Sequence, residues 1–250
     1  MATIDIREGA GVRTLHFGSD WIQGAMRIAR PWHLELEYTR EMMASLLLRD
    51  DSRFPRNALL IGLGAASLTK FLYRNYPLCN LTVVEIEPNV VAAARQFFKL
   101  PEDSRRLNIV IADGAEFVIN SNKQYDLVLV DGFDAQARSG PLNTLPFYQN
   151  CRARLRGDGV IAINLLSRSR DFKGNLERIR TAFDGRAFAL PACDSGNVIA
   201  LGATGEPIRL EMDELREQAL ALKENTGLNL LPVISRLEKS PSSAGGVLDL

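Results

Sequence analysis

The feature that most constrains the fold is a repeated alternation of short apolar runs with helical patterns between residues 58 and 203. The apolar runs are rich in Val, Leu and Ile and include ALLIGLG, LTVVEIE, LNIVIAD, YDLVLVD and GVIAINL. Parallel strands that are covered on both faces require such continuous apolar runs. Two more strand candidates, RAFALP and NVIALGA, raise the expected number of strands to seven. The order predicts an α/β fold with a Rossmann-like, doubly wound, mostly parallel seven-stranded sheet.

The chain divides into three parts by pattern. Residues 1–33 alternate β-favouring stretches with Gly and Asp turn signals, which predicts a short N-terminal β appendage. Residues 34–238 hold the β-helix alternation, beginning with a helix expected over residues 34–48, and form the expected catalytic domain. Residues 239–250 include SPSSAGG, whose composition predicts a flexible tail.

Composition excludes several classes of protein. The 250 residues carry 30 Lys plus Arg against 30 Asp plus Glu, so no basic field favours a nucleic-acid partner, and a small-molecule substrate is expected. Cys79, Cys151 and Cys193 lack metal-ligand or disulfide spacing, so we expect reduced core thiols and no metal site. No stretch of about 18 apolar residues is present, and the start lacks a signal-peptide core. The chain is therefore expected to be cytoplasmic, without a membrane partner.

In an open α/β sheet, ligands bind at the carboxyl ends of the strands. At the first such end, Gly62 and Gly64 allow a tight turn and a close approach of backbone to ligand. At the second, Glu85 can accept hydrogen bonds from both hydroxyls of a ribose. At the third, Asp113 can accept from an adenine amine while Gly114 leaves room for the ring, although the pair could also form a simple helix N-cap. Together these residues predict an adenosine pocket.

The fourth strand end carries two carboxylates, Asp131 and Asp134, in VLVDGFDA. A dinucleotide enzyme could share the first turn and Glu85, but it does not need two acids facing the reacting group. An amine substrate does need them, because it is a cation that must lose a proton before it can act as a nucleophile. Together with the Asp113-Gly114 strand end, Asp131 favours an S-adenosyl ligand over a dinucleotide. Asp131 and Asp134 could instead cap a loop or a helix. The following AQARSGPLNT is expected to form a lid.

The series of motifs from Gln23 to Leu165 resembles the spermidine synthase (polyamine aminopropyltransferase) family, which has the S-adenosylmethionine-dependent, class I methyltransferase fold. The resemblance rests on IQGAM, LEYTREMM, LLIGLGAAS, VVEIEPNVV, IADGAEF, LVLVDGFDA and PFYQNCRARLRGDGVIAIN, in the order and spacing of the family. It implies transfer of an aminopropyl group from decarboxylated S-adenosylmethionine to a polyamine such as putrescine. It also implies a homodimer and assigns the site residues as follows: ribose binding to Glu85, adenine contacts to Asp113 and Gly114, donor binding to the Gly62 and Gly64 turn, proton acceptance to Asp131, and substrate binding to Asp134 and Gln23.

Two departures from the family pattern keep other functions open. The family's glycine turn reads GGGDGG, and here Ala65 stands in the place of its acid. The family's Tyr-His-Glu or Tyr-Gln-Glu triplet aligns with Thr39, Arg40 and Glu41, with Tyr38 displaced by one position. One alternative is a methyltransferase in which Arg40 binds the methionine carboxylate of the donor. The other is a catalytically weak module that binds an adenosyl compound or a polyamine.

Overall fold

The structure, a computed structural model that describes residues 3–49, 53–134, 138–193 and 195–250, is built around one seven-stranded sheet. The strand order is β6-β5-β4-β7-β8-β10-β9. The neighbours from β6 to β8 are parallel, and β10 is antiparallel to both β8 and β9. The predicted doubly wound, mostly parallel sheet is thereby confirmed. The strands are β4 Asn57–Ile61, β5 Asn80–Glu85, β6 Leu107–Ile111, β7 Tyr125–Val130, β8 Leu155–Leu166, β9 Ala187–Ala189 and β10 Asn197–Ala203.

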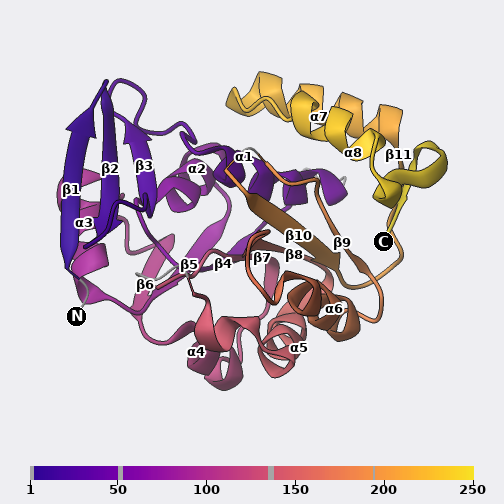
Figure 1. Cartoon of the computed structure of the whole chain (residues 1–250), viewed down its shortest axis with the longest axis horizontal. Helices are drawn as coiled ribbons and strands as arrows, with labels where there is room; N and C mark the ends of the chain where they lie inside the picture. The colour runs from indigo at the N-terminus through magenta and orange to yellow at the C-terminus, as the bar shows by residue number, and fades with distance from the viewer. Residues whose placement is uncertain (1–2, 50–52, 135–137, 194) are drawn as a thin grey trace.

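Both faces of the sheet are buried. Along β4, Ala58 and Leu60 belong to one apolar cluster and Leu59 and Ile61 to another, as the period of two along a strand requires. The second cluster lies under three helices, which Figure 1 shows together on one side of the sheet. These helices are α4 Gly114–Asn120, α5 Leu145–Ala153 and α6 Phe172–Ala182. The first cluster includes α2 Ser67–Asn75 and α3 Pro88–Phe97 on the opposite face.

The N-terminal region forms the expected antiparallel strands. β1 Ile4–Gly9, β2 Val12–Phe17 and β3 Gly24–Arg27 pair in that order. The helix expected over residues 34–48 is present in two parts, α1 Glu37–Met42 and the 3₁₀ helix η1 Met43–Leu48. Every residue of η1 is buried, which explains why the apolar run continues past the end of α1.

The C-terminal region differs from its prediction. The expected surface helices are present as α7 Met212–Thr226 and α8 Leu231–Glu238, but residues 239–250 form more than a tail. They contain the 3₁₀ helix η3 Pro241–Gly246 and the strand β12 Val247–Asp249, which pairs antiparallel with β11 Arg209–Glu211. The physical reason is the apolar end of the chain, where Leu248 and Leu250 are buried against the core, a signal that the small polar residues before it obscured. No described helix is long and apolar enough to cross a membrane.

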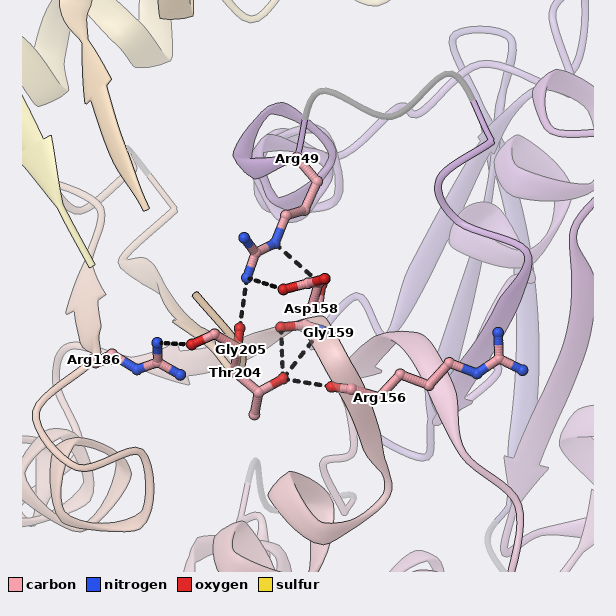
Figure 2. A network of polar contacts seen from close by, with 7 residues as sticks. All are labelled: Arg49, Arg156, Asp158, Gly159, Arg186, Thr204 and Gly205. Carbon is pink, nitrogen blue, oxygen red and sulfur yellow. Dashed lines mark hydrogen bonds and ion pairs between the residues drawn. The ribbon is translucent and has the colours of Figure 1, made fainter. Parts of the chain in front are cut away.

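A network of polar contacts stabilises the amino end of β8 (Figure 2). Arg49, just after η1, donates to the carbonyl oxygens of Asp158 and Thr204. The Thr204 hydroxyl donates to the Arg156 carbonyl at 2.7 Å and accepts from the Gly159 amide at 3.0 Å. The network ties η1, β8 and the segment after β10 together at the end of the sheet away from Asn164. It therefore fixes the strands whose other ends carry the candidate site.

Candidate active site

A cavity of about 890 Å³ lies at the carboxyl ends of the central strands. This is the edge at which open α/β sheets bind ligands. The N-terminal strands also contribute, because Phe17 and the segment between β2 and β3 line the same cavity. All the site residues predicted from the sequence lie in its wall: Gln23, Gly62, Gly64, Glu85, Asp113, Gly114, Asp131 and Asp134.

The turn after β4 requires glycine at Gly62. Its φ is +99°, and a Cβ at this position would lie 2.1 Å from the carbonyl oxygen of Asp131. The Gly62 amide donates to Val84 at 2.9 Å, and the Asp131 amide donates to Ile61 at 2.8 Å. The turn therefore packs directly on the end of β7, and a side chain there would separate the two strand ends.

Glu85 ends β5 and is 8% exposed. Its Oε2 accepts from the Leu63 amide at 2.9 Å, and its Oε1 accepts from the Glu87 amide at 3.0 Å. Burial raises the pKa of the Glu85 carboxyl, and these backbone donors offset part of the rise. The residue thus holds the glycine turn, and it lines the cavity.

Asp113 and Gly114 each stabilise the fold, independently of any contact with a ligand. Asp113 caps α4, because its Oδ1 accepts from the Ala115 amide at 2.7 Å and the Glu116 amide at 3.2 Å. A Cβ at Gly114 would lie 2.4 Å from the Cγ2 of Ile61, so packing against β4 already requires glycine there. Both residues still line the cavity beside Glu85.

Asp131 follows β7 and lies in the cavity wall, half-buried and held by side chains from two other elements. Its Oδ2 accepts from the Tyr38 hydroxyl at 3.1 Å, and its Oδ1 accepts from the Asn164 amide at 2.8 Å. The Asn164 side-chain oxygen in turn accepts from the Asn197 amide at 2.9 Å. The Asn197 oxygen accepts from the Ser195 hydroxyl at 2.7 Å. This chain of neutral groups fixes the orientation of the carboxylate.

The electrostatics of Asp131 suit a proton acceptor. Burial raises the pKa of its carboxyl, and the hydrogen bonds from Asn164 and Tyr38 lower it, so the net pKa lies above its usual value. Burial, together with the charge of Asp131, raises the pKa of Tyr38 well above its usual value, so the phenol stays a hydrogen-bond donor. A base gains strength as its pKa rises toward the working pH.

Asp134 differs from Asp131 because it is paired with a cation. Its Oδ2 accepts from the Arg138 Nε at 2.9 Å, and its Oδ1 accepts from the Arg138 amide, also at 2.9 Å. The expected lid follows. Its residues 135–137 lie outside the described residues, while the 3₁₀ helix η2 Gly140–Asn143 borders the cavity.

The structure shows where the two departures from the family pattern, at Ala65 and Arg40, lie relative to the cavity. Ala65 is 2% exposed and lies under β3, where a Cβ on Gly24 would be 2.6 Å from the Ala65 Cβ. Arg40 is not part of the cavity wall. Its Nη1 donates to the carbonyl oxygens of Leu34, at 3.1 Å, and Glu35, at 2.7 Å. The hypothesis that Arg40 binds a donor carboxylate is therefore wrong for this structure.

Sequence reasoning missed several residues of the wall. The sequence pattern marks Tyr38 only as displaced by one position from the family triplet. It does not point to four other residues of the wall, Asn164, Asn197, Trp21 and Arg168. Asn164 had a usable signal, since a polar residue near the carboxyl end of the apolar run GVIAINL is unusual. The others carry no local signal, because their roles depend on contacts between distant segments.

None of the three cysteines lines the cavity. Cys79, Cys151 and Cys193 are buried and free. Burial raises the pKa of the Cys79 thiol to about 12. Within the ranges that the structure describes, no group of three or more His, Cys, Asp and Glu side chains is placed to hold a metal ion.

Comparisons with known proteins bear on the family and the fold. The spermine/spermidine synthase domain matches residues 36–169. The polyamine aminopropyltransferase of Chromobacterium violaceum is 36% identical over 99% of this chain and 94% of its own. Two solved structures share the fold. A probable spermidine synthase from Corynebacterium glutamicum has a TM-score of 0.72 at 17% identity, over 91% of this chain and 92% of its own. A spermidine synthase in complex with the transition-state analogue AdoDATO has a TM-score of 0.59 at 24% identity, over 82% and 74%.

Proposed function

Because this chain belongs to the spermine/spermidine synthase family, we propose that it transfers an aminopropyl group from decarboxylated S-adenosylmethionine to a small amine such as putrescine, releasing methylthioadenosine. The observation that carries the proposal is the environment of Asp131. It is a half-buried carboxylate held by Tyr38 and Asn164, at the point where two differently built parts of the cavity meet.

The first part, here called the donor half, is formed by Gly62, Gly64, Glu85, Asp113 and Gly114 at the ends of β4, β5 and β6. Glu85 accepts from the two ribose hydroxyls, and Asp113 accepts from the adenine amine. The glycine turn brings backbone close to the ligand. The fit is supported by the position of the Glu85 carboxylate, which lines the cavity and is held in place by the Leu63 and Glu87 amides. Donor binding by an S-adenosyl compound is consistent with the AdoDATO complex of the related spermidine synthase.

The second part, here called the acceptor half, is formed by Tyr38, Asp131, Asn164, Asn197, Trp21 and Arg168. The amine enters as an ammonium ion, and Asp131 accepts one proton from its nitrogen. The freed lone pair attacks the carbon beside the sulfonium. The new carbon–nitrogen bond forms as the carbon–sulfur bond breaks, and the sulfur keeps that electron pair as a neutral thioether. Tyr38 and Asn164 keep the Asp131 oxygens aimed at the amine throughout.

Asp134 and Gln23 have supporting roles in this proposal. Asp134 attracts the ammonium group, although its pairing with Arg138 means that the amine must share or displace that cation. Gln23 lies between the two halves, where its carbonyl oxygen would be 3.2 Å from a Cβ at Gly64. That oxygen belongs to the backbone, and Gln23 also lines the cavity, which supports a role in substrate binding. We also propose that the protein is cytoplasmic, as its sequence composition indicates, and homodimeric, as the family resemblance implies. Light scattering after size-exclusion chromatography measures the assembly.

The test is direct detection of products by mass spectrometry. The purified protein is incubated with putrescine and either decarboxylated S-adenosylmethionine or S-adenosylmethionine. We expect equal amounts of methylthioadenosine and of the aminopropylated amine from the decarboxylated donor only. A methylated product from S-adenosylmethionine would instead establish the methyltransferase alternative. Binding of methylthioadenosine without transfer to any amine would establish the binding module.

A further inference from the structure

At the outer edge of the acceptor half, two residues meet that the proposed mechanism does not use. The guanidinium carbon of Arg168 lies 4.4 Å from the centroid of the Trp21 ring. Both residues line the cavity, and Trp21 is 48% exposed. A guanidinium at this distance makes a cation–π contact with the indole. One face of the Trp21 ring is therefore already occupied by a cation of the protein itself.

The position of the pair follows from the strand order. Arg168 comes two residues after the end of β8, and β8 lies on the side of β7 away from β4, β5 and β6. The donor half occupies the ends of those three strands. An amine whose nitrogen reaches Asp131 at the end of β7 must therefore extend its other end toward β8. The far end of a long acceptor would meet Arg168 and Trp21.

The charges on this side of the cavity favour the same conclusion. Three carboxylates of the wall could attract a second or third ammonium group, but each already pairs with an arginine. The pairs are Asp20 with Arg7 at 2.9 Å, Glu37 with Arg236 at 3.6 Å and Asp134 with Arg138 at 2.9 Å. In the described ranges, Arg168 has no such carboxylate partner, so its charge is not neutralised by an ion pair. An additional ammonium group approaching it is repelled.

We propose that Arg168 is a specificity-determining residue that restricts the acceptor to short diamines by occupying the face of Trp21. An aromatic face is a binding surface for ammonium ions. If Arg168 were absent, Trp21 would offer that surface to the distal ammonium group of a longer polyamine. The inference rests on the proposed aminopropyl transfer and defines the acceptor class of that reaction.

The test compares a diamine with a triamine by calorimetry, with the protein saturated with methylthioadenosine and at fixed ionic strength. The ratio of dissociation constants for spermidine and putrescine is measured in the parent and in Arg168→Gln. We expect the variant to bind spermidine about tenfold more tightly, because a repulsive charge is replaced by an open cation–π site, with putrescine binding nearly unchanged. Arg170→Gln is the matched control, because it removes the same charge two residues away at an exposed position outside the cavity wall.

A double variant separates the role of Trp21 from simple removal of charge. In a Trp21→Leu background, Arg168→Gln should no longer improve spermidine binding. A gain that persists there, an equal gain in Arg170→Gln, or an unchanged ratio in Arg168→Gln would each overturn the inference. The proposed function fails separately, if the parent transfers no aminopropyl group to any amine in the product assay.

Discussion

The two halves of the cavity are built in different ways. In the donor half, the hydrogen bonds that hold the two acids join parts of the chain no more than 22 residues apart. Glu85 accepts from Glu87, two residues on, and from Leu63, 22 residues away, while Asp113 caps its own helix. In the acceptor half, Tyr38 reaches Asp131 across 93 residues, and Asn164 reaches it across 33. A local motif can specify the first kind of site, whereas the second exists only after the sheet has formed.

The largest effect should follow from removing the base of the acceptor half. Asp131→Asn keeps the shape of the side chain but cannot accept the amine proton, so kcat should fall by about 10²- to 10⁴-fold. Methylthioadenosine binding should remain nearly as in the parent, because the donor half is unchanged. Steady-state transfer assays and calorimetry on the same preparations measure the two quantities. As a comparison, Asp134→Asn should act mainly through the KM of the amine. Parental turnover in Asp131→Asn would refute the mechanism.

A complementary loss is expected in the donor half. Glu85→Ala removes the acceptor for two ribose hydroxyls and should weaken methylthioadenosine binding by about 10²-fold. It also frees the Leu63 and Glu87 amides, so thermal unfolding must first show that the variant is folded. Glu116→Ala, at an exposed position of α4, is the control substitution. Equal affinity in Glu85→Ala and the parent would remove Glu85 from the ribose site.

A smaller effect tests whether Asn164 positions Asp131. Asn164→Leu removes the amide donor and should lower kcat by about tenfold, since hydrogen bonds to charged groups contribute roughly 1.5–3 kcal/mol. Because that hydrogen bond lowers the pKa of Asp131, its loss should shift the acid limb of the kcat pH profile to higher pH. Asn108→Leu, at an exposed position of β6, is the control. A reduced kcat with an unshifted profile would indicate a structural role only.

The smallest effect concerns how α1, the helix that carries Tyr38, is held. Glu41 of α1 is buried and pairs with Arg236 of α8. Burial raises the pKa of Glu41 to about 7. The folded protein therefore binds this proton more tightly than the unfolded chain, and the free energy of unfolding contains a contribution that falls as pH rises from about 4.5 to 7. Above that range the decline stops, because the group is ionised in both states.

Urea unfolding at several pH values from 5 to 8 measures this contribution. Glu41→Gln cannot ionise, so it should be least stable relative to the parent at low pH and gain relative stability as pH rises. Glu224→Gln, at an exposed position of α7, should run parallel to the parent. The opposite trend in Glu41→Gln would show that the ion pair with Arg236 outweighs the cost of burial.

The difference between short-range and long-range contacts also explains which features could be predicted from the sequence. The sheet was predictable because apolar runs covered on both faces leave a continuous pattern. The place of Gly62, Glu85 and Asp113 at the cavity was predictable because they follow or end those runs. Trp21 and Arg168 were not predictable, since their contact joins a loop between β2 and β3 to a loop after β8. The C-terminal strand was missed because only Val247 and Leu248 mark it, and their strand character depends on pairing with β11. Arg40 was misjudged because its helical position did not reveal the backbone carbonyls that bind it.

The close approach of Gly24 to Ala65 constrains any redesign of the glycine turn. A Cβ on Gly24 would lie 2.6 Å from that of Ala65 and 2.7 Å from its backbone nitrogen, so residue 24 cannot carry a side chain while β3 and the turn stay where they are. Ala65 itself is 2% exposed, so a carboxylate introduced there would be buried and would need a partner. A design that places an acid in the turn must therefore supply that partner without enlarging residue 24.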